Sequence, residues 1–242
     1  MRVVFGIITN GLRPDKLQAT LDSIWTQRID ITNLEVVVAG DVERARNIAH
    51  LEAGLLIEER EAAEAGLLGV MRNAIADAIL RRYPLPDVCV FADDDILFKL
   101  DFCRQIAEFK DDWDLMCPRI ENPDGTRYWD WATVGGPKGH RLLDYGETDE
   151  FWYNTGGLMV CKPAVIQKVR WPAVPINNHL KGGQNEDLLF SRVVQDEEFR
   201  VKVNPRALAV HDAPLTSRRR RFIVTVESAD REEGVDHGQS NG

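Results

Sequence analysis

Short, almost continuously apolar runs alternate with amphipathic stretches along the first hundred residues. Parallel strands that are covered on both faces show such runs, because neither side of the strand meets water. The runs expected to form strands are residues 3–8, 34–39, 55–58 and 88–92. Pro14 suits the first position of a helix that places Leu17, Leu21 and Ile24 on one face, and residues 67–82 repeat this spacing. The order predicts right-handed βαβ units in an α/β fold, with a mostly parallel central sheet flanked by helices.

The second half of the chain continues this alternation less regularly. Helices are predicted for residues 102–109, from Pro163 onward and for 188–194, and strands for 115–120, 158–161, 201–203 and 207–210. No period holds over residues 121–153, and a long irregular segment in a compact domain is typical of functional or mobile loops. Its scattered aromatic rings either stack on flat ligand faces such as sugar rings or form a small hydrophobic cluster beneath a loop. Because no repeat, linker or composition break marks a second domain, we expect one domain over residues 1–226 and a disordered tail over 227–242.

Three consecutive acids, Asp93, Asp94 and Asp95, follow the predicted strand at residues 88–92 and precede further apolar residues. Alternate residues of an extended segment point the same way, so Asp93 and Asp95 are expected to converge on one hard cation while Asp94 faces elsewhere. Oxygen ligands suit Mg²⁺ or Mn²⁺, and such an ion can hold a diphosphate. A solvated acidic loop is the competing interpretation, and the apolar flanks on both sides weigh against it.

Polar residues also follow the two other long strands predicted in this half. Thr9 and Asn10 come after the first strand, and Asp41 comes after the second. Ligands of open α/β sheets lie outside the carboxyl ends of the strands, so these residues are expected on the same rim as the three acids. Arg72 and Asn73 lie near the start of the next helix. They are either plain surface residues or contacts of a nucleotide or its phosphates.

Composition narrows the possible partners. The 242-residue chain has a formal net charge of -9, which argues against a general nucleic-acid binder because such proteins neutralise phosphates. No apolar run has the length of a membrane span, and the apolar start is too short for a signal peptide. The four cysteines form no CxxC pair and sit in apolar segments. We expect reduced core thiols and a cytoplasmic protein without a transmembrane segment.

Together these features resemble the GT-A class of nucleotide-sugar glycosyltransferases, in a family 2-like form, from Val3 to about His211. Four motifs in this order carry the resemblance, and they are the DxD signature at 93–95, Gly156-Gly157, the Gly-Gly-x-x-Glu-Asp stretch ending at Glu186-Asp187, and the late His211. The glycine-rich helix start is similar to that of galactosyl- and N-acetylgalactosaminyl-transferases. The sequence differs from the class at two positions. Ile8 replaces the usual proline, and Asp41 matches the acid that follows the second strand but at a slightly shifted position.

The resemblance implies a single-domain, Rossmann-like GT-A fold, with a nucleotide-binding part over about residues 1–100 and an acceptor-binding part over about 101–226. It assigns donor binding to Thr9, Asn10, Asp41, Arg72, Asn73, Asp94, Gly156 and Gly157. It assigns the ligands of a Mn²⁺ or Mg²⁺ ion to Asp93, Asp95 and His211. The basic cluster Arg218–Arg221 either closes over the diphosphate, as the tails of similar enzymes do, or is a solubilising tail.

Sugar transfer to a hydroxyl needs positive charge on the leaving diphosphate and, if the sugar inverts, a carboxylate that accepts the proton. Asp187 is the candidate base, with Glu186 as the alternative if the helix phase shifts by one; both acids could instead simply complement the helix dipole. We expect an inverting transfer of a hexose or N-acetylhexosamine. The favoured donor is a UDP-sugar, ahead of a GDP-sugar, and the acceptor a glycan, lipid-linked or natural-product substrate.

Three other functions are weighed against this one. A nucleotidyltransferase shares the sheet, the acids and the metal, but normally has a glycine-rich basic loop after the first strand, of which residues 9–13 are a poor version. A non-catalytic binding protein would not need every expected acid and His211. A transferase acting on modified bases in DNA would use Arg218–Arg221, whereas the net charge of -9 disfavours it. The sequence leaves the oligomeric state open.

Overall fold

The fold was obtained as a computed structural model, which describes residues 1–29, 31, 33–45, 48, 51, 54–82, 84–134, 140–148, 150–155, 157–176 and 184–213. Met1–Asp212 form one compact unit, and all described residues except Ala213 belong to it. The predicted domain end at 226 and the tail from 227 fall outside the described residues. No helix in the described part of the chain combines the length and the apolar character that crossing a bilayer requires.

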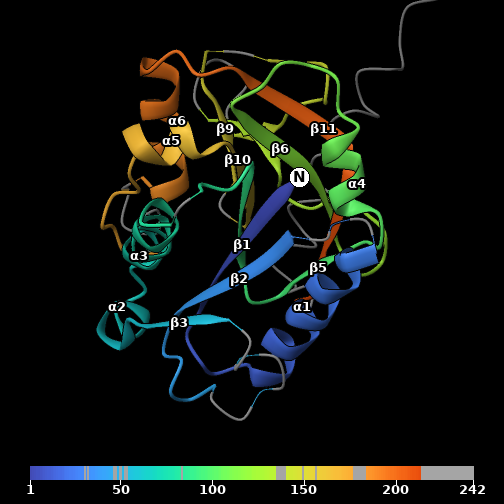
Figure 1. The fold of residues 1–242 in the computed structure, drawn as a ribbon. Coiled ribbons are helices and arrows are strands. Elements are labelled where there is room, and N and C mark those ends of the chain that lie inside the picture. The colour runs from blue at the N-terminus through green and yellow to red at the C-terminus, as the bar shows by residue number, and fades with distance from the viewer. Residues whose placement is uncertain are drawn as a thin grey trace, which may run out of the picture. The chain divides into compact units, whose positions relative to one another are not determined.

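A central sheet of eight strands organises this unit (Figure 1). Its parallel half contains β3 (Leu55–Glu58), β2 (Asn33–Gly40), β1 (Arg2–Thr9) and β4 (Val88–Asp93), in that spatial order. The other half continues with β10 (Leu158–Cys161), β6 (Leu115–Glu121), β11 (Val201–His211) and β5 (Ile96–Phe98). β6 and β11 are parallel, whereas β10 and β5 run antiparallel to their neighbours. The predicted α/β fold with a mostly parallel sheet is confirmed.

Helices cover both faces of the sheet (Figure 1). On one face, α1 (Pro14–Thr26) and α4 (Phe102–Ala107) pack on the side chains of Val3, Phe5 and Ile7. On the other face, α3 (Leu68–Leu80), α5 (Pro163–Lys168) and α6 (Glu186–Asp196) pack on Val4 and Ile8. A strand buried on both sides needs no polar alternation, which is why β1 reads as a continuous apolar run. The shorter α2 (Arg60–Glu64) and the 3-10 turn η1 (Gln27–Ile29) complete the helices of the described residues.

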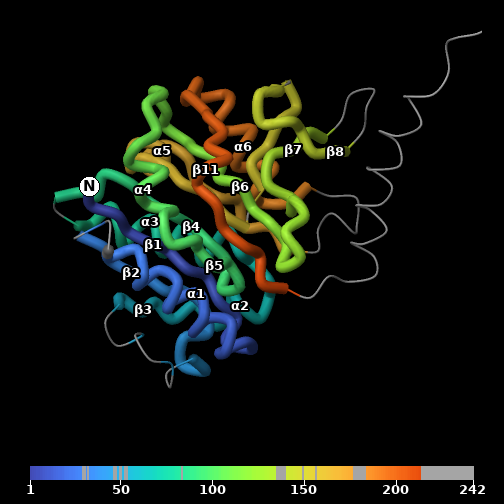
Figure 2. The backbone as a smooth tube through the Cα atoms, turned by 90° about the vertical axis from the view of Figure 1, so that its right-hand side faces the viewer, coloured from blue at the N-terminus to red at the C-terminus, as the bar shows by residue number. Residues whose placement is uncertain are grey.

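Residues 121–153, predicted to be irregular, contain a second sheet of three strands. It consists of β8 (Arg141–Leu142), β7 (Trp131–Thr133) and β9 (Trp152–Asn154), and Figure 2 shows β7 and β8 beyond β6 and β11. Strands of two or three residues are too short to show a period, so these three strands were not predicted. Most other described residues of the segment lie in turns and irregular backbone, as predicted. The rings of Trp131 and Trp152 stack at 5.0 Å, and Trp131 packs with Cys117 and Leu143. For Trp131 the hydrophobic-cluster interpretation is confirmed.

The two short strands predicted at 201–203 and 207–210 are one strand, β11, with a bulge. The pairing of β11 with β6 shifts register between Asn204 and Leu208. The bulge consists of Pro205, Arg206 and Ala207, which follow Asn204 and have no partner in β6. Proline has no N–H to donate to a ladder, which suits it to a bulge. The side chain of the buried Asn204 donates from Nδ2 to the carbonyl of Gln105, at 3.1 Å. β11 thereby continues to His211.

Candidate functional site

The carboxyl ends of three neighbouring strands bring the predicted polar residues to one rim of the sheet. Thr9 at the end of β1 pairs with Gly40 of β2, directly before Asp41, and Ile8 pairs with Asp93 of β4. The amide of Asp93 donates to the carbonyl of Gly157, just before β10, at 3.2 Å. The predicted common rim is therefore confirmed.

The three acids do not continue the strand. β4 ends at Asp93, and the chain turns at Asp94 and Asp95 into β5. The Thr20 hydroxyl of α1 donates to the carbonyl of Asp94 at 3.0 Å, and this hydrogen bond anchors the turn to α1. The alternation predicted for Asp93 and Asp95 required an extended backbone, so the expectation that Asp94 faces away from Asp95 was wrong. Asp94 and Asp95 instead share a partner.

That partner is Arg13, the residue before α1. Its Nη1 donates to Asp95 Oδ2 at 2.6 Å, and its Nη2 pairs with Asp94 Oδ1. Both carboxylates are almost fully buried, whereas 43% of the Arg13 side chain remains accessible. Burial by itself lowers the pKa of Arg13, but Asp94 and Asp95 raise it above its ordinary value. Burial raises the pKa of Asp94, against the hydrogen bond from Thr9, whose Oγ1 donates at 2.6 Å.

His211 reaches the same turn from the end of β11. β11 pairs with β5 so that His211 is level with Ile96, and the amide of Asp212 donates to the carbonyl of Asp95 at 2.7 Å. The imidazole Nε2 lies 3.5 Å from Asp95 Oδ2, and His211 is 6% exposed. The ring of Tyr128 stacks on it with centroids 4.1 Å apart and planes 9° from parallel. Asp95 and His211 thus meet although 115 residues separate them in the chain.

A buried arginine joins this rim to the start of α6. Arg72 on α3 is 1% exposed and donates to Glu186 Oε1 at 2.7 Å and to Asp93 Oδ1 at 2.9 Å. Burial raises the pKa of Asp93 to about 7, Arg72 opposes the shift, and the negative charges of Asp95 and Asp94 reinforce it. Since 28% of the Asp93 side chain is accessible, solvent moderates the effect of burial. The predicted contact of Arg72 with nucleotide phosphates stays a prediction; the structure places its guanidinium between two acids of the chain.

The two acids proposed as a base occupy the first turn of α6. Glu186 is 4% exposed and faces Arg72, whereas Asp187 is 8% exposed and accepts a hydrogen bond at 2.8 Å from the amide of Leu188. The charge of Asp187 contributes to the raised pKa of Tyr153, after the larger effect of burial. Tyr153 comes from β9, so α6 brings Asp187 beside the second sheet. The N-terminal position of both acids also suits the helix dipole.

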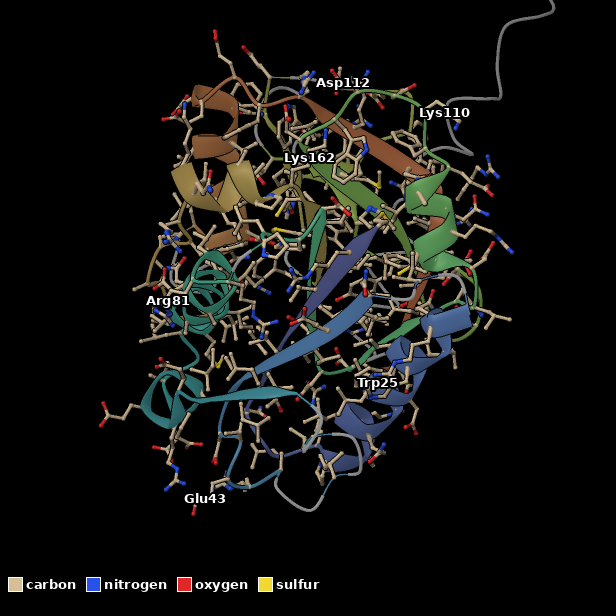
Figure 3. The ribbon with its side chains drawn as sticks, in the orientation of Figure 1. Trp25, Glu43, Arg81, Lys110, Asp112 and Lys162 are labelled. Atoms are coloured by element: carbon tan, nitrogen blue, oxygen red, sulfur yellow. The ribbon has the colours of Figure 1, made fainter. Side chains whose placement is uncertain are left out.

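A pocket of about 230 Å³ opens at the carboxyl end of β2. It is lined by Asp41, Glu43, Arg44, Arg60 and Glu64. Asp41 is 2% exposed and lies 3.4 Å from Arg44 Nε and 3.7 Å from Arg60 Nε. Glu43 points outward from the loop after β2 (Figure 3). Because β2 and β4 are two strand spacings apart, this pocket lies about 10 Å along the rim from the acidic turn.

The remaining predicted donor residues have structural partners of their own. Asn10 is exposed at the rim, and its Oδ1 accepts from the amide of Leu12 at 3.0 Å. Asn73 exchanges two hydrogen bonds with the backbone of Trp171, at 2.7 and 3.0 Å. A Cβ added at Gly157 would make an ordinary van der Waals contact with Ile96 at 3.9 Å, so packing does not require glycine here. Gly156, Gly182-Gly183 and Arg218–Arg221 lie outside the described residues.

The donor set at the turn fits a divalent cation. Asp95 Oδ1 is buried without a hydrogen-bond partner, an arrangement that is costly unless another group compensates it. Within the described ranges, no three or more His, Cys, Asp or Glu side chains are grouped as a complete metal cage. Mg²⁺ is commonly bound by one or two carboxylates plus substrate phosphates. Asp95 would be the carboxylate ligand here, with the His211 imidazole beside it and the other positions left to water or substrate oxygens.

Two residues of this site were not singled out by the sequence. Arg13 was considered only as part of the helix start and of the poor phosphate loop at residues 9–13, and Tyr128 was one of many aromatics in the irregular segment. The position of Arg13 after the first strand, beside the rim, was the available signal for the arginine. Nothing local in the sequence marks Tyr128 as the neighbour of His211, because their contact depends on the pairing of β6 with β11.

Comparison with known proteins finds neither a matching family model nor a matching curated sequence. Solved structures do match, among them three that each cover 98% of this chain. They are S. aureus TarS 1-349 in complex with UDP-GlcNAc (TM-score 0.53, 17% identity, 68% of that chain), the mannosyltransferase PcManGT from Pyrobaculum calidifontis in complex with GDP-Man and Mn²⁺ (0.57, 16%, 66%), and the inositol-1-phosphate CTP transferase from T. maritima (0.51, 14%, 98%).

These likenesses concern the fold. The mixed α/β unit, with its large central sheet and flanking helices, has the GT-A-like fold of the two glycosyltransferases. The chain spans about two thirds of the TarS fragment and of the mannosyltransferase, and 41% of a longer TarS chain. The T. maritima protein shares the fold over nearly its full length.

Proposed function

We propose that this protein is a metal-dependent glycosyltransferase, which moves a sugar from a nucleoside-diphosphate sugar to a hydroxyl acceptor. One observation carries the proposal. Asp95 and His211, from two distant segments, meet at a rim where an orphaned carboxylate oxygen is buried, and Arg72 ties the same rim to the acids of α6. Glycosyl transfer from a nucleotide sugar requires cation ligands, room for a nucleotide and a base, and the proposal assigns these to Asp95 and His211, to the pocket at Asp41 and to Asp187.

The donor would lie along the rim. Its nucleoside would occupy the pocket at Asp41, and its diphosphate would extend toward the turn at Asp94 and Asp95, with Thr9 between them. The bound UDP-GlcNAc of the TarS fragment and the bound GDP-Man of the mannosyltransferase support a nucleotide-sugar donor. We favour a UDP-sugar carrying a hexose or N-acetylhexosamine, and a glycan, lipid-linked or natural-product acceptor.

Asp95 and His211 would hold Mn²⁺ or Mg²⁺, with Asp93 close enough along the turn to assist. When bound, such an ion supplies Lewis-acid stabilisation of the leaving diphosphate. The chain's own part is to orient the ligands. The amide of Asp212 holds the carbonyl of Asp95, and Tyr128 fixes the plane of the His211 ring. The apolar surroundings of the turn strengthen these electrostatic contacts by excluding water.

Asp187 is the better candidate for the base of an inverting transfer. Glu186 forms a buried ion pair with Arg72, and protonating Glu186 would deprive that guanidinium of a partner at considerable cost. Asp187 lies on the next position of the helix, toward the second sheet and Tyr153. A carboxylate there would accept the proton of an acceptor hydroxyl that enters between α6 and the second sheet. The residues of the second sheet would then decide the acceptor.

A nucleotidyltransferase is the second candidate, because the T. maritima CTP transferase matches this chain over nearly all of both lengths. In that reaction a nucleoside triphosphate loses pyrophosphate and no sugar leaves a diphosphate. Asp187 would have no acceptor hydroxyl to deprotonate. We rank this function second, since the loop after β1 offers Arg13 to two acids of the chain instead of forming a basic phosphate loop.

A thermal-shift panel tests the proposal. UDP, GDP, CDP and dTDP, their sugars, and CTP are each added with Mn²⁺ and with EDTA. A ligand that binds only the native state raises its stability by mass action. Stabilisation by one nucleoside diphosphate or its sugar that depends on Mn²⁺ is expected. Stabilisation by CTP alone would support the nucleotidyltransferase, and no stabilisation by any nucleotide would overturn both.

A further inference from the structure

Arg13 holds the two buried carboxylates of the acidic turn at the same time. Arg13 forms ion pairs with both Asp94 and Asp95, and its Nη1 lies 2.6 Å from Asp95 Oδ2. The same Oδ2 faces His211 at 3.5 Å, and the other oxygen of Asp95 is the orphaned one. The guanidinium of Arg13 therefore contacts the same carboxylate that the proposed cation would bind.

A divalent cation and this guanidinium compete for the same charge. A metal ligated by Asp95 would lie about 2 Å from a carboxylate oxygen, within about 5 Å of a guanidinium that remained in place. Two cations at that separation repel strongly in a partly buried site. Arg13 can leave without repacking the core, because 43% of its side chain is accessible. Asp94 would keep the hydrogen bond from Thr9, at 2.6 Å, so neither acid would be left without compensation.

We propose that Arg13 is a place-holding cation, which neutralises Asp94 and Asp95 until metal and donor arrive together and then moves onto the donor's diphosphate. This inference rests on the proposed function. Arginine is suited to both partners, because its planar fork binds carboxylates and phosphates in the same bidentate geometry. The exchange conserves the charge balance of the site. The metal neutralises the carboxylates that Arg13 leaves, and the incoming diphosphate becomes the new anionic partner of Arg13.

The thermodynamic consequence is coupling between metal and nucleotide. Metal alone must displace Arg13 into solvent, which weakens its binding. Metal with a nucleoside diphosphate gives Arg13 a new anionic partner, so each ligand raises the affinity for the other by the same factor. Removing the guanidinium should therefore strengthen binding of the metal alone and reduce the coupling. A residue with a merely structural role would show the opposite, because its loss would loosen the site and weaken every ligand.

Calorimetric titration of the metal-free protein with Mn²⁺, with and without saturating UDP, tests this proposal. For Arg13→Gln we expect Mn²⁺ alone to bind about tenfold more tightly than to the wild type, and UDP to increase the Mn²⁺ affinity by a smaller factor. Arg13→Lys keeps the charge and should restore weak binding of Mn²⁺ alone. Adding Asp95→Asn to Arg13→Gln should abolish the gain, which assigns it to this site.

Arg200 provides a matched control at the opposite end of the sheet. It pairs with Asp114 at 2.9 Å and with Asp112, and 52% of its side chain is accessible. Asp112 lies far from Glu43 in Figure 3. Arg200→Gln should leave Mn²⁺ binding and its coupling unchanged.

Unchanged or weaker Mn²⁺ affinity in Arg13→Gln would overturn the proposal that Arg13 is a place-holding cation. If no nucleotide raised the Mn²⁺ affinity of the wild type, the proposed function and the coupling would fail. A gain of Mn²⁺ affinity in Arg13→Gln would then still support the competition between arginine and metal.

Discussion

Tyr128 lies flat against the imidazole of His211, with ring centroids 4.1 Å apart and planes 9° from parallel. Tyr128 is half-buried, comes from the loop after β6 and donates its amide to the carbonyl of Ile120 at 2.8 Å, so its ring is anchored by the sheet. Tyr128 covers one face of the imidazole, and the ring edge that carries Nε2 faces Asp95. Tyr128 therefore orients the imidazole of His211, the proposed metal ligand.

Removing this ring should weaken metal binding without removing any ligand. Aromatic pairs contribute about 0.5–1.5 kcal/mol beyond their buried area, so Tyr128→Ala should lower the Mn²⁺ affinity measured with UDP by roughly two- to tenfold. Tyr128→Phe keeps the stacked ring and should bind Mn²⁺ like the wild type. Equal losses in both variants would show that the hydroxyl matters, and the stacking argument would be wrong.

Asp95→Asn and His211→Ala should remove the dependence of donor binding on the metal. At a ligand concentration of 100 times Kd, binding stabilises the native state by about 2.7 kcal/mol. Both variants should lose most of this gain with Mn²⁺, so that their thermal shifts equal those measured in EDTA. Asp77→Asn, at a surface ion pair on α3, is the control and should keep the full shift. A normal Mn²⁺-dependent shift in Asp95→Asn would move the metal away from the acidic turn.

Asp187→Asn should separate turnover from binding. The variant keeps the shape of the side chain and its hydrogen bond from the Leu188 amide, so donor binding should be nearly intact. Loss of the base should reduce kcat by about 10²–10⁴-fold. Full activity would move the base to Glu186 or indicate a retaining mechanism, which needs no such base. The stereochemistry of the product, read by NMR, distinguishes the two.

Arg72→Met should destabilise the fold strongly. Removing one partner of a buried ion pair leaves an uncompensated charge, which costs about 3–5 kcal/mol. Here both Glu186 and Asp93 lose their partner, and Glu186 is almost fully buried. Arg170→Met removes the half-exposed pair with Asp77 and should cost at most about 1 kcal/mol. The free energies of unfolding from urea titration compare the two, and similar costs would contradict the structural weight given to Arg72.

All four cysteines are buried and none is in a disulfide, as the sequence predicted. Burial raises the pKa of Cys117 well above its ordinary value, and a hydrogen bond with Cys89 together with burial raises that of Cys161. Raised thiol pKa values in the folded state mean that ionisation favours unfolding. The stability they contribute is complete below the unfolded pKa of about 8.5 and is lost as the pH rises further.

Thiol reactivity and alkaline unfolding check this account. In native buffer at pH 8 none of the four thiols should react rapidly with Ellman's reagent, and all four should react in denaturant. Cys117→Ala should show a smaller loss of stability between pH 8 and 10 than the wild type. A fast-reacting thiol in the native protein would contradict the burial of these side chains.

The fold was predictable where a strand or helix is long enough to show its period. β1, β2, β4, α1 and α3 were recognised because five or more residues repeat one pattern. β5 was missed because three residues show no period, and α2 was missed because its five residues bury only Ala62 and Ala63. The bulge in β11 was predicted as a loop between two strands, because Asn204 and Pro205 interrupt the apolar run.

The candidate site was predictable as a set of residues at one rim, but not as a set of contacts. The carboxyl-end rule brought Thr9, Asp41 and Asp93 together without knowledge of distances. The sharing of Arg13 by Asp94 and Asp95 depends on a turn at these two residues, where an extended segment was expected. The buried link from Arg72 to Glu186 joins residues 114 positions apart, and no local pattern indicates such a pair.

The bulge of β11 has a consequence for how this site is specified. Between Asn204 and Leu208 the strand advances four residues while β6 advances one, so three residues pass without a partner. The number of these unpaired residues sets the position of His211 along β11 relative to Asp95. One residue fewer would draw His211 back by about 3.3 Å and turn its ring to the other face of the sheet. A deletion there would disable the proposed metal site while every side chain assigned to it remained in the sequence, so the site is encoded in a count of residues as well as in their chemistry.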